Sequence, residues 1–144
     1  MPQQLQRRQD WPEALAAYII AALYRPHAWG THDCVTFARG AVEAVTGAAI
    51  ALPVAWTDQA SARAALQAAG GLPAAVDSVL PRLPSVLLAW RGDIVLVREP
   101  TRDPWLAVVF DGLAWAPSPT GLAIAAIEHA VIGWTVGRWN VDRG

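Results

Sequence analysis

Apolar positions in the first half of the chain recur at the three- and four-residue spacing of an α-helix. Asp10-Trp11-Pro12-Glu13 has the composition of a helix start: an Asp N-cap, Pro in the first turn and Glu at the third position. Leu15, Tyr18, Ile19, Ala22 and Leu23 then keep helical spacing up to Pro26. The pattern predicts a first helix between Asp10 and Pro26, with Asp10 as its N-cap.

A second helix is predicted to begin at Asp33 or Cys34 and to end near Gly47. Its apolar stripe places Cys34 on the buried face at the helix tip. A third, alanine-rich helix begins at Thr57 or Asp58 and is closed by Gly70-Gly71, and a short fourth runs from Leu72 to Leu80. Pro81 to Trp90 is predicted to be irregular.

After Arg91-Gly92-Asp93 the pattern becomes rich in β-branched and aromatic residues. Four strands are predicted, at Ile94 to Val97, Trp105 to Phe110, Leu113 to Ala116 and Val131 to Trp139. Asp111-Gly112 indicates a hairpin between the second and third. Helices followed by strands predict an α+β domain in which the Cys34 helix packs on an antiparallel sheet.

Composition adds limits to this picture. The 144 residues are expected to form one domain, 1–144, with its own core. A formal net charge of −1, with eleven scattered arginines, gives no electrostatic footprint for nucleic acid. No apolar run reaches the roughly 18 residues of a membrane span. Eight tryptophans are many for this length, and we expect some of them at protein interfaces.

Candidate chemistry centres on Cys34, the only cysteine, because a helix N-terminus favours the thiolate. A helix dipole supplies only about 0.3–1 kcal/mol, so the thiol is expected to stay protonated near neutral pH unless a base assists it. His32 is too close in sequence to face the sulfur and is expected to bond locally. His27 is expected to be a solvated loop residue, whereas His129 could approach the sheet. Without a base, Cys34 is simply a small buried hydrophobe.

Other sequence signals are weaker indications of function than Cys34. Arg91-Gly92-Asp93 spells an adhesion tripeptide, but a turn entering a strand accounts for it. No spacing of His, Cys and Asp matches a metal site, and no cofactor is expected. Trp105, Trp115, Trp134 and Trp139 are expected in the core or at its rim, with a glycan-binding groove as an alternative.

The ordered motifs resemble the NlpC-type cell-wall peptidases of the papain-like superfamily. The resemblance covers about residues 10–140 and rests on Trp29 to Cys34, Thr46-Gly47, Gly70-Gly71, Arg91 to Asp93 and Trp134. It is closest to a branch encoded among phage tail genes. It implies an NlpC-type domain in which N-terminal helices pack on a C-terminal antiparallel sheet or partial barrel.

Two peptidase positions differ from the family pattern. The peptidases carry a His in a His-Val-Gly-Ile-Tyr-x-Gly strand, and aligning that strand with Leu106 to Gly112 puts Leu106 at the base. The third polar residue falls at about Trp115. The resemblance therefore implies a degenerate peptidase, because amide cleavage needs a general acid that a lone thiol cannot supply.

The resulting expectation is a tail-tip or baseplate structural or assembly protein of a bacteriophage virion tail, assembled in the host cytoplasm. Its partners would be other tail proteins in an oligomeric complex, with peptidoglycan contact as an option. The alternative is an active cysteine hydrolase of peptidoglycan peptides, with Cys34 as nucleophile, Asp33 beside it, and His32 or His129 as base. The Val35 N–H would then contribute to the oxyanion hole. A third reading is a peptidoglycan-binding module without turnover.

Overall fold

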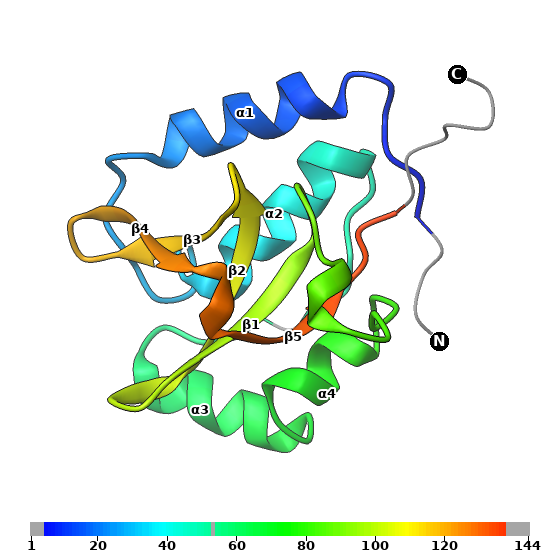
Figure 1. Cartoon of the computed structure of the whole chain (residues 1–144). Coiled ribbons are helices and arrows are strands. Elements are labelled where there is room, and N and C mark those ends of the chain that lie inside the picture. Colours follow the sequence, from blue (N-terminus) through cyan, green and yellow to red (C-terminus); the bar gives the residue numbers. More distant parts are fainter. Residues whose placement is uncertain (1–4, 53, 138–144) are drawn as a thin grey trace.

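The computed structural model describes residues 5–52 and 54–137, in which four α-helices precede a five-stranded antiparallel sheet (Figure 1). The helices are α1 Trp11–Ala22, α2 Cys34–Thr46, α3 Gln59–Ala68 and α4 Leu72–Asp77, with 3-10 turns η1 Val86–Leu88 and η2 Ile127–His129. The strands are β1 Ile94–Glu99, β2 Arg102–Phe110, β3 Leu113–Ser118, β4 Gly121–Ala126 and β5 Ala130–Trp134. The predicted α+β class, with helices first and strands second, is confirmed.

The predicted capping residues begin α1, α2 and α3, whereas the predicted end of α4 is wrong. α2 begins after Asp33 and ends at Gly47 in the left-handed region, at φ 76°. α3 is capped by the Asp58 side chain. Asp10 is the N-cap residue of α1, as predicted, but its carboxylate forms no cap hydrogen bond and instead accepts hydrogen bonds from the Arg8 guanidinium at 2.8 and 2.9 Å. α4 ends at Asp77, three residues before the predicted Leu80.

The sheet order is β4-β3-β2-β1-β5, so β4 and β5 are consecutive in sequence but lie at opposite edges. Only η2 joins them. The four backbone steps from Ala126 to Ala130 reach at most about 14 Å, whereas the outer strands of a flat five-stranded sheet lie roughly 19 Å apart. The sheet must therefore curl. The inner face of the sheet can accommodate this curl because many of the side chains buried on it are small: Ala107, Ala114, Ala116 and Ala130.

Two strand predictions need correction. β4 was not predicted, because Gly121–Ala126 has Ile124 as its only β-branched residue and takes its strand conformation from pairing with β3. β5 ends at Trp134, and the rest of the predicted strand includes Trp139, which lies outside the described residues.

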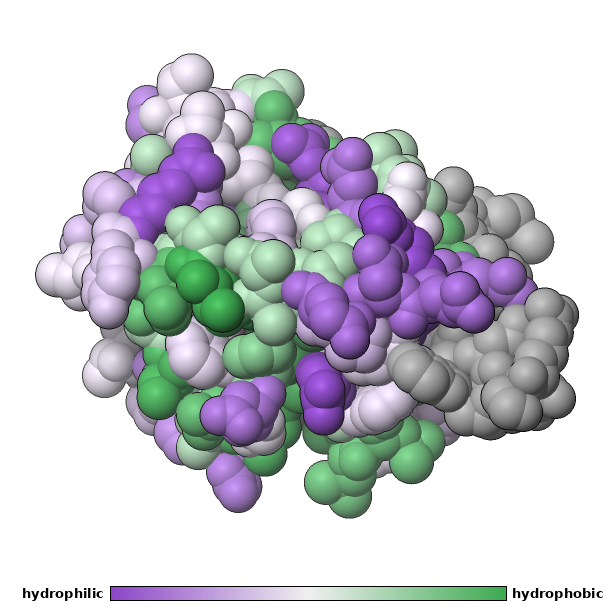
Figure 2. All heavy atoms as spheres, turned by 90° about the horizontal axis from the view of Figure 1, so that it is seen from above, coloured by the Kyte–Doolittle hydropathy of each residue, from purple (hydrophilic) through white to green (hydrophobic). Residues whose placement is uncertain are grey.

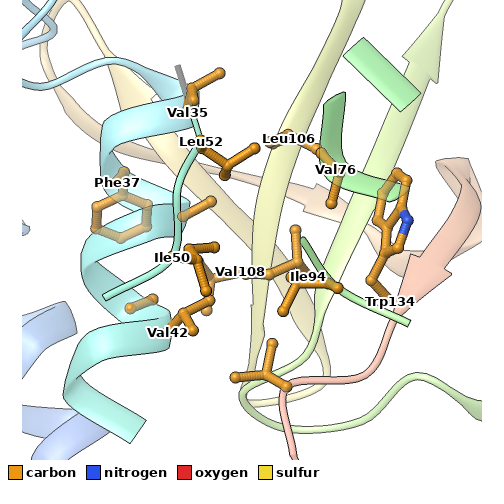
Figure 3. Packing of buried hydrophobic residues seen from close by; sticks show 14 of the residues in the cluster. Val35, Phe37, Val42, Ile50, Leu52, Val76, Ile94, Leu106, Val108 and Trp134 are labelled. Atoms are coloured by element: carbon orange, nitrogen blue, oxygen red, sulfur yellow. The ribbon is translucent and has the colours of Figure 1, made fainter. Parts of the chain in front are cut away.

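α2 packs on the middle of the sheet and fixes where Cys34 lies. Val35 and Val42 of α2 face Leu106 and Val108 of β2 and Ile94 of β1 (Figure 3). Phe37 lies on the other side of the helix and stacks on Tyr18 of α1, with ring centroids 5.2 Å apart. α1 covers one side of α2, and α3 with α4 lie at the opposite end of the molecule (Figure 1). The N-terminal tip of α2, with Cys34, therefore lies beside β2.

Candidate functional site

Asp33 is the hydrogen-bonding centre of the loop that precedes Cys34. Its Oδ1 accepts from the backbone N–H groups of Val35 and Thr36 at 3.0 and 2.9 Å, and Thr36 Oγ1 accepts from the Asp33 N–H in return. Oδ2 accepts from the Gly30 N–H at 2.8 Å and from Trp56 Nε1 at 2.7 Å. Four donors occupy a carboxylate that is 1% exposed. Asp33 thus holds the loop in place and has no oxygen directed toward the thiol as a base.

Gly30 allows this loop to approach the segment that carries Trp56. Its φ is +83°, a conformation that suits glycine. A Cβ at this position would collide with the carbonyl oxygen of Trp56. Gly30 and Asp33 of the Trp-Gly-x-x-Asp-Cys motif are therefore explained by the packing of one loop against another.

Cys34 is half-buried and lines a pocket of about 650 Å³. Burial raises the pKa of its thiol to about 11, and the negative charge of Asp33 adds to the increase. The backbone N–H of Leu106, which donates toward the sulfur, and the positive charge of Arg102 act in the opposite direction without cancelling the effect. At neutral pH the group is therefore a thiol, which is a poor nucleophile.

Leu106, the residue aligned with the peptidase base, lies beside Cys34, toward which its backbone N–H donates. Its side chain is fully buried in the core against which Cys34 packs. Trp115, aligned with the third catalytic residue, lies on β3 opposite Val108 and donates its indole N–H to the Phe110 carbonyl at 2.7 Å. Neither position carries a group that can exchange a proton with the sulfur.

The three histidines lie at different sites. His32 is buried, its ring edge-on to Phe37 at 5.8 Å, and burial lowers its pKa. His129 is exposed in η2 and does not line the pocket. His27, expected to be solvated, is instead half-buried in the pocket wall, edge-on to Trp29 at 4.6 Å. Within residues 5–52 and 54–137, no histidine is among the groups that shift the pKa of Cys34, and His32 Nε2 has no hydrogen-bond partner.

Sequence reasoning missed His27 because nothing in Arg25-Pro26-His27 distinguishes a pocket residue from a surface one. The position is fixed by a distant contact, the hydrogen bond from the His27 backbone N–H to the Ser118 carbonyl at 2.8 Å. This bond attaches the loop to the end of β3, which also contributes to the pocket wall.

The Gly92-Asp93 motif belongs to a second buried centre. The Arg7 guanidinium contacts Asp93 Oδ1 at 3.0 Å and the Arg91 carbonyl at 2.6 Å, with the Trp11 and Trp90 rings at 4.3 and 5.1 Å. Asp93 also accepts from the Val136 and Trp90 N–H groups. Because Asp93 is 1% exposed, it cannot serve as an adhesion residue.

None of the helices among the described residues is long and apolar enough to cross a membrane. Among the same residues, no group of three His, Cys, Asp or Glu side chains could hold a metal ion.

Comparison with known proteins gives one match. No curated protein and no solved structure matches the chain. The family described as "Domain of unknown function (DUF6950)" matches residues 6–136, which includes α1 to β5 and both buried centres. Since this match spans nearly the whole sequence, the chain belongs to that family.

Proposed function

We propose that this chain is a structural or assembly protein of a bacteriophage tail tip or baseplate, built on an NlpC-type papain-like fold that has lost its peptidase chemistry. Three observations support the fold assignment: helices precede the sheet, the only cysteine opens the helix that packs on it, and β2 passes beside the sulfur. The ordered series of motifs, from Trp29 to Cys34 through to Trp134, supports the branch encoded among phage tail genes.

One observation carries the loss of catalysis. The thiol of Cys34 has a pKa of about 11, and the strand position beside it is the buried aliphatic Leu106. A papain-like mechanism needs a thiolate and an acid that protonates the leaving nitrogen. Neither requirement is met by the residues next to the sulfur.

The surface supports a role in binding. Around η1, Leu87 is 90% exposed, Leu88 59% and Trp90 46%, within the segment Pro81 to Trp90 that the sequence predicts to be irregular. Elsewhere, the face seen from above α1 shows separate hydrophobic groups between hydrophilic ones (Figure 2). Exposed leucines beside a tryptophan are typical of the apolar centre of a protein interface.

The experiment uses a phage or lysogen that encodes this chain. We expect the chain to co-purify with tails by mass spectrometry, and its deletion to give defective tails. Complementation with Cys34→Ser should restore infectivity fully, whereas Leu87→Glu with Leu88→Glu should not. Tails without the chain, or Cys34→Ser that fails to complement, would overturn the proposal.

A second candidate is an active cysteine hydrolase, favoured by one observation: His27 and Cys34 line the same pocket. In this case His27 would take the thiol proton, with the pair brought together when substrate binds. Purified protein should then release new amine termini from peptidoglycan, and both His27→Ala and Cys34→Ser should abolish the release. Binding to cell walls without new amine termini would instead indicate a peptidoglycan-binding module.

A further inference from the structure

Four charged residues line the pocket beside Cys34, and three of them already have partners. Asp33 is occupied by its four N–H donors. Asp103 Oδ2 accepts from Arg63 Nε at 3.0 Å and Nη2 at 2.6 Å, which joins β2 to α3 at the pocket rim. A cationic ligand would therefore find no carboxylate free to receive it.

Arg102 is the fourth charged residue. Among the described residues it has no ion pair and no side-chain hydrogen bond. Its guanidinium lies over the Trp105 ring, 5.0 Å from the centroid, an arrangement that orients it. Its charge reaches into the pocket, because it lowers the pKa of Cys34. Arg102 is thus available to pair with an anion.

The rest of the wall is mainly apolar. Alongside Leu66 and Leu72 it includes Val35, three alanines and three prolines. Of the three tryptophans in the wall, Trp56 and Trp105 are only 5% and 6% exposed, and Trp29, 38% exposed, packs edge-on against His27, so the wall offers a single partly exposed ring for a sugar to stack on. A volume of about 650 Å³ lies in the range of pockets for small ligands, roughly 300–1,000 Å³. The wall therefore favours a short apolar segment over a glycan.

We propose that this pocket binds the C-terminal residues of a partner protein, with apolar side chains against the wall and the terminal carboxylate on Arg102. The guanidinium offers a planar pair of N–H donors that matches a carboxylate. The inference rests on the proposed assembly role, because the bound peptide is held and is not cleaved.

The test titrates the purified full chain with N-acetyl-Ala-Leu-Phe, once as the free acid and once as the C-terminal amide. Binding is followed by NMR through the indole N–H signals of Trp29, Trp56 and Trp105. We expect the acid to bind three- to tenfold more tightly than the amide, since Arg102 is solvent-exposed and its ion pair is screened. Arg102→Gln should remove this difference. Arg98→Gln, an exposed arginine on β1 outside the pocket, should keep it.

Equal binding of acid and amide, or no shift of the pocket indoles with either, would overturn the proposal. A free acid ending in D-Ala-D-Ala that binds more tightly than the L-peptide would also overturn it, in favour of a cell-wall ligand. Mass spectrometry of the peptide after incubation distinguishes a failure of the proposed assembly role from a failure of the proposed carboxylate site. Bound but cleaved peptide would contradict the assembly role and leave the carboxylate site standing, whereas intact, unbound peptide would contradict the site alone.

Discussion

The backbone N–H of Leu106 donates toward the sulfur of Cys34, and the Leu106 side chain is buried in the same core. Strand β2 thus brings an aliphatic residue to the only thiol of the chain. Burial in this core raises the pKa of that thiol to about 11 even though the Leu106 N–H acts in the opposite direction, so the packed cysteine stays protonated at neutral pH.

Restoring an imidazole at this position tests the alignment. We expect Leu106→His to place the ring next to Cys34 and to lower the thiol pKa by one unit or more, because a nearby imidazolium favours the thiolate. The variant should also be less stable, since it buries a polar ring in an apolar core. The pH dependence of alkylation measures the pKa, and circular dichroism checks folding.

Val108→His is the matched control. Val108 lies on the same face of β2, also fully buried, but two residues, about 7 Å, further along the strand. It should destabilise the protein to a similar extent and leave the pKa of Cys34 unchanged. Equal pKa changes in both variants, or an unchanged pKa in folded Leu106→His, would mean that the strand alignment is shifted.

How far the sequence predicts this site depends on the distance between partners. The cap formed by Asp33 and Thr36 is local and follows from residue type and spacing. The bond between Asp33 and Trp56 spans 23 residues, and the one between Arg7 and Asp93 spans 86. No periodic pattern encodes such pairs. The same holds for His27, whose place in the pocket depends on a backbone contact with β3.

The buried ion pair predicts a large effect of a small change. Burial raises the pKa of Asp93 and lowers that of Arg7, which means that it disfavours the charged form of both groups. The charge of each residue favours the charged form of the other. Asp93→Asn should lower the free energy of unfolding by about 3–5 kcal/mol, because it leaves a buried guanidinium unpaired. Denaturant unfolding measures this. Asp10→Asn breaks an exposed pair with Arg8 and should cause no measurable change; equal effects of the two substitutions would contradict the account.

Trp56→Phe tests the loop that holds the cysteine. It removes one donor from the Asp33 carboxylate while keeping most of the aromatic packing. A hydrogen bond to a charged group contributes about 1.5–3 kcal/mol, and we expect a loss of that size in urea unfolding. Trp29→Phe, at an exposed indole, should cost little. The expectation fails if Trp56→Phe unfolds at the wild-type urea concentration.

Alkaline pH should destabilise the protein through Cys34. Because the thiol pKa rises from 9.0 to about 11 on folding, its contribution is complete below about pH 9 and is lost as pH rises toward 11. Burial also raises the pKa of Tyr18 to about 12, so ionisation of Tyr18 destabilises the protein over an overlapping range of pH. The comparison is therefore with Cys34→Ser. The wild type should lose about 2 kcal/mol more than this variant between pH 8 and 11, and parallel pH profiles would exclude the raised thiol pKa.

The alkylation rate of Cys34 at pH 7 by iodoacetamide tests the central claim most directly, measured on folded protein and on the same chain in urea. With a pKa near 11, the folded thiol should react about a hundredfold more slowly than the unfolded one, and peptidoglycan should remain uncut. Faster reaction in the folded state, together with peptidoglycan cleavage that disappears in Cys34→Ser, would contradict the account.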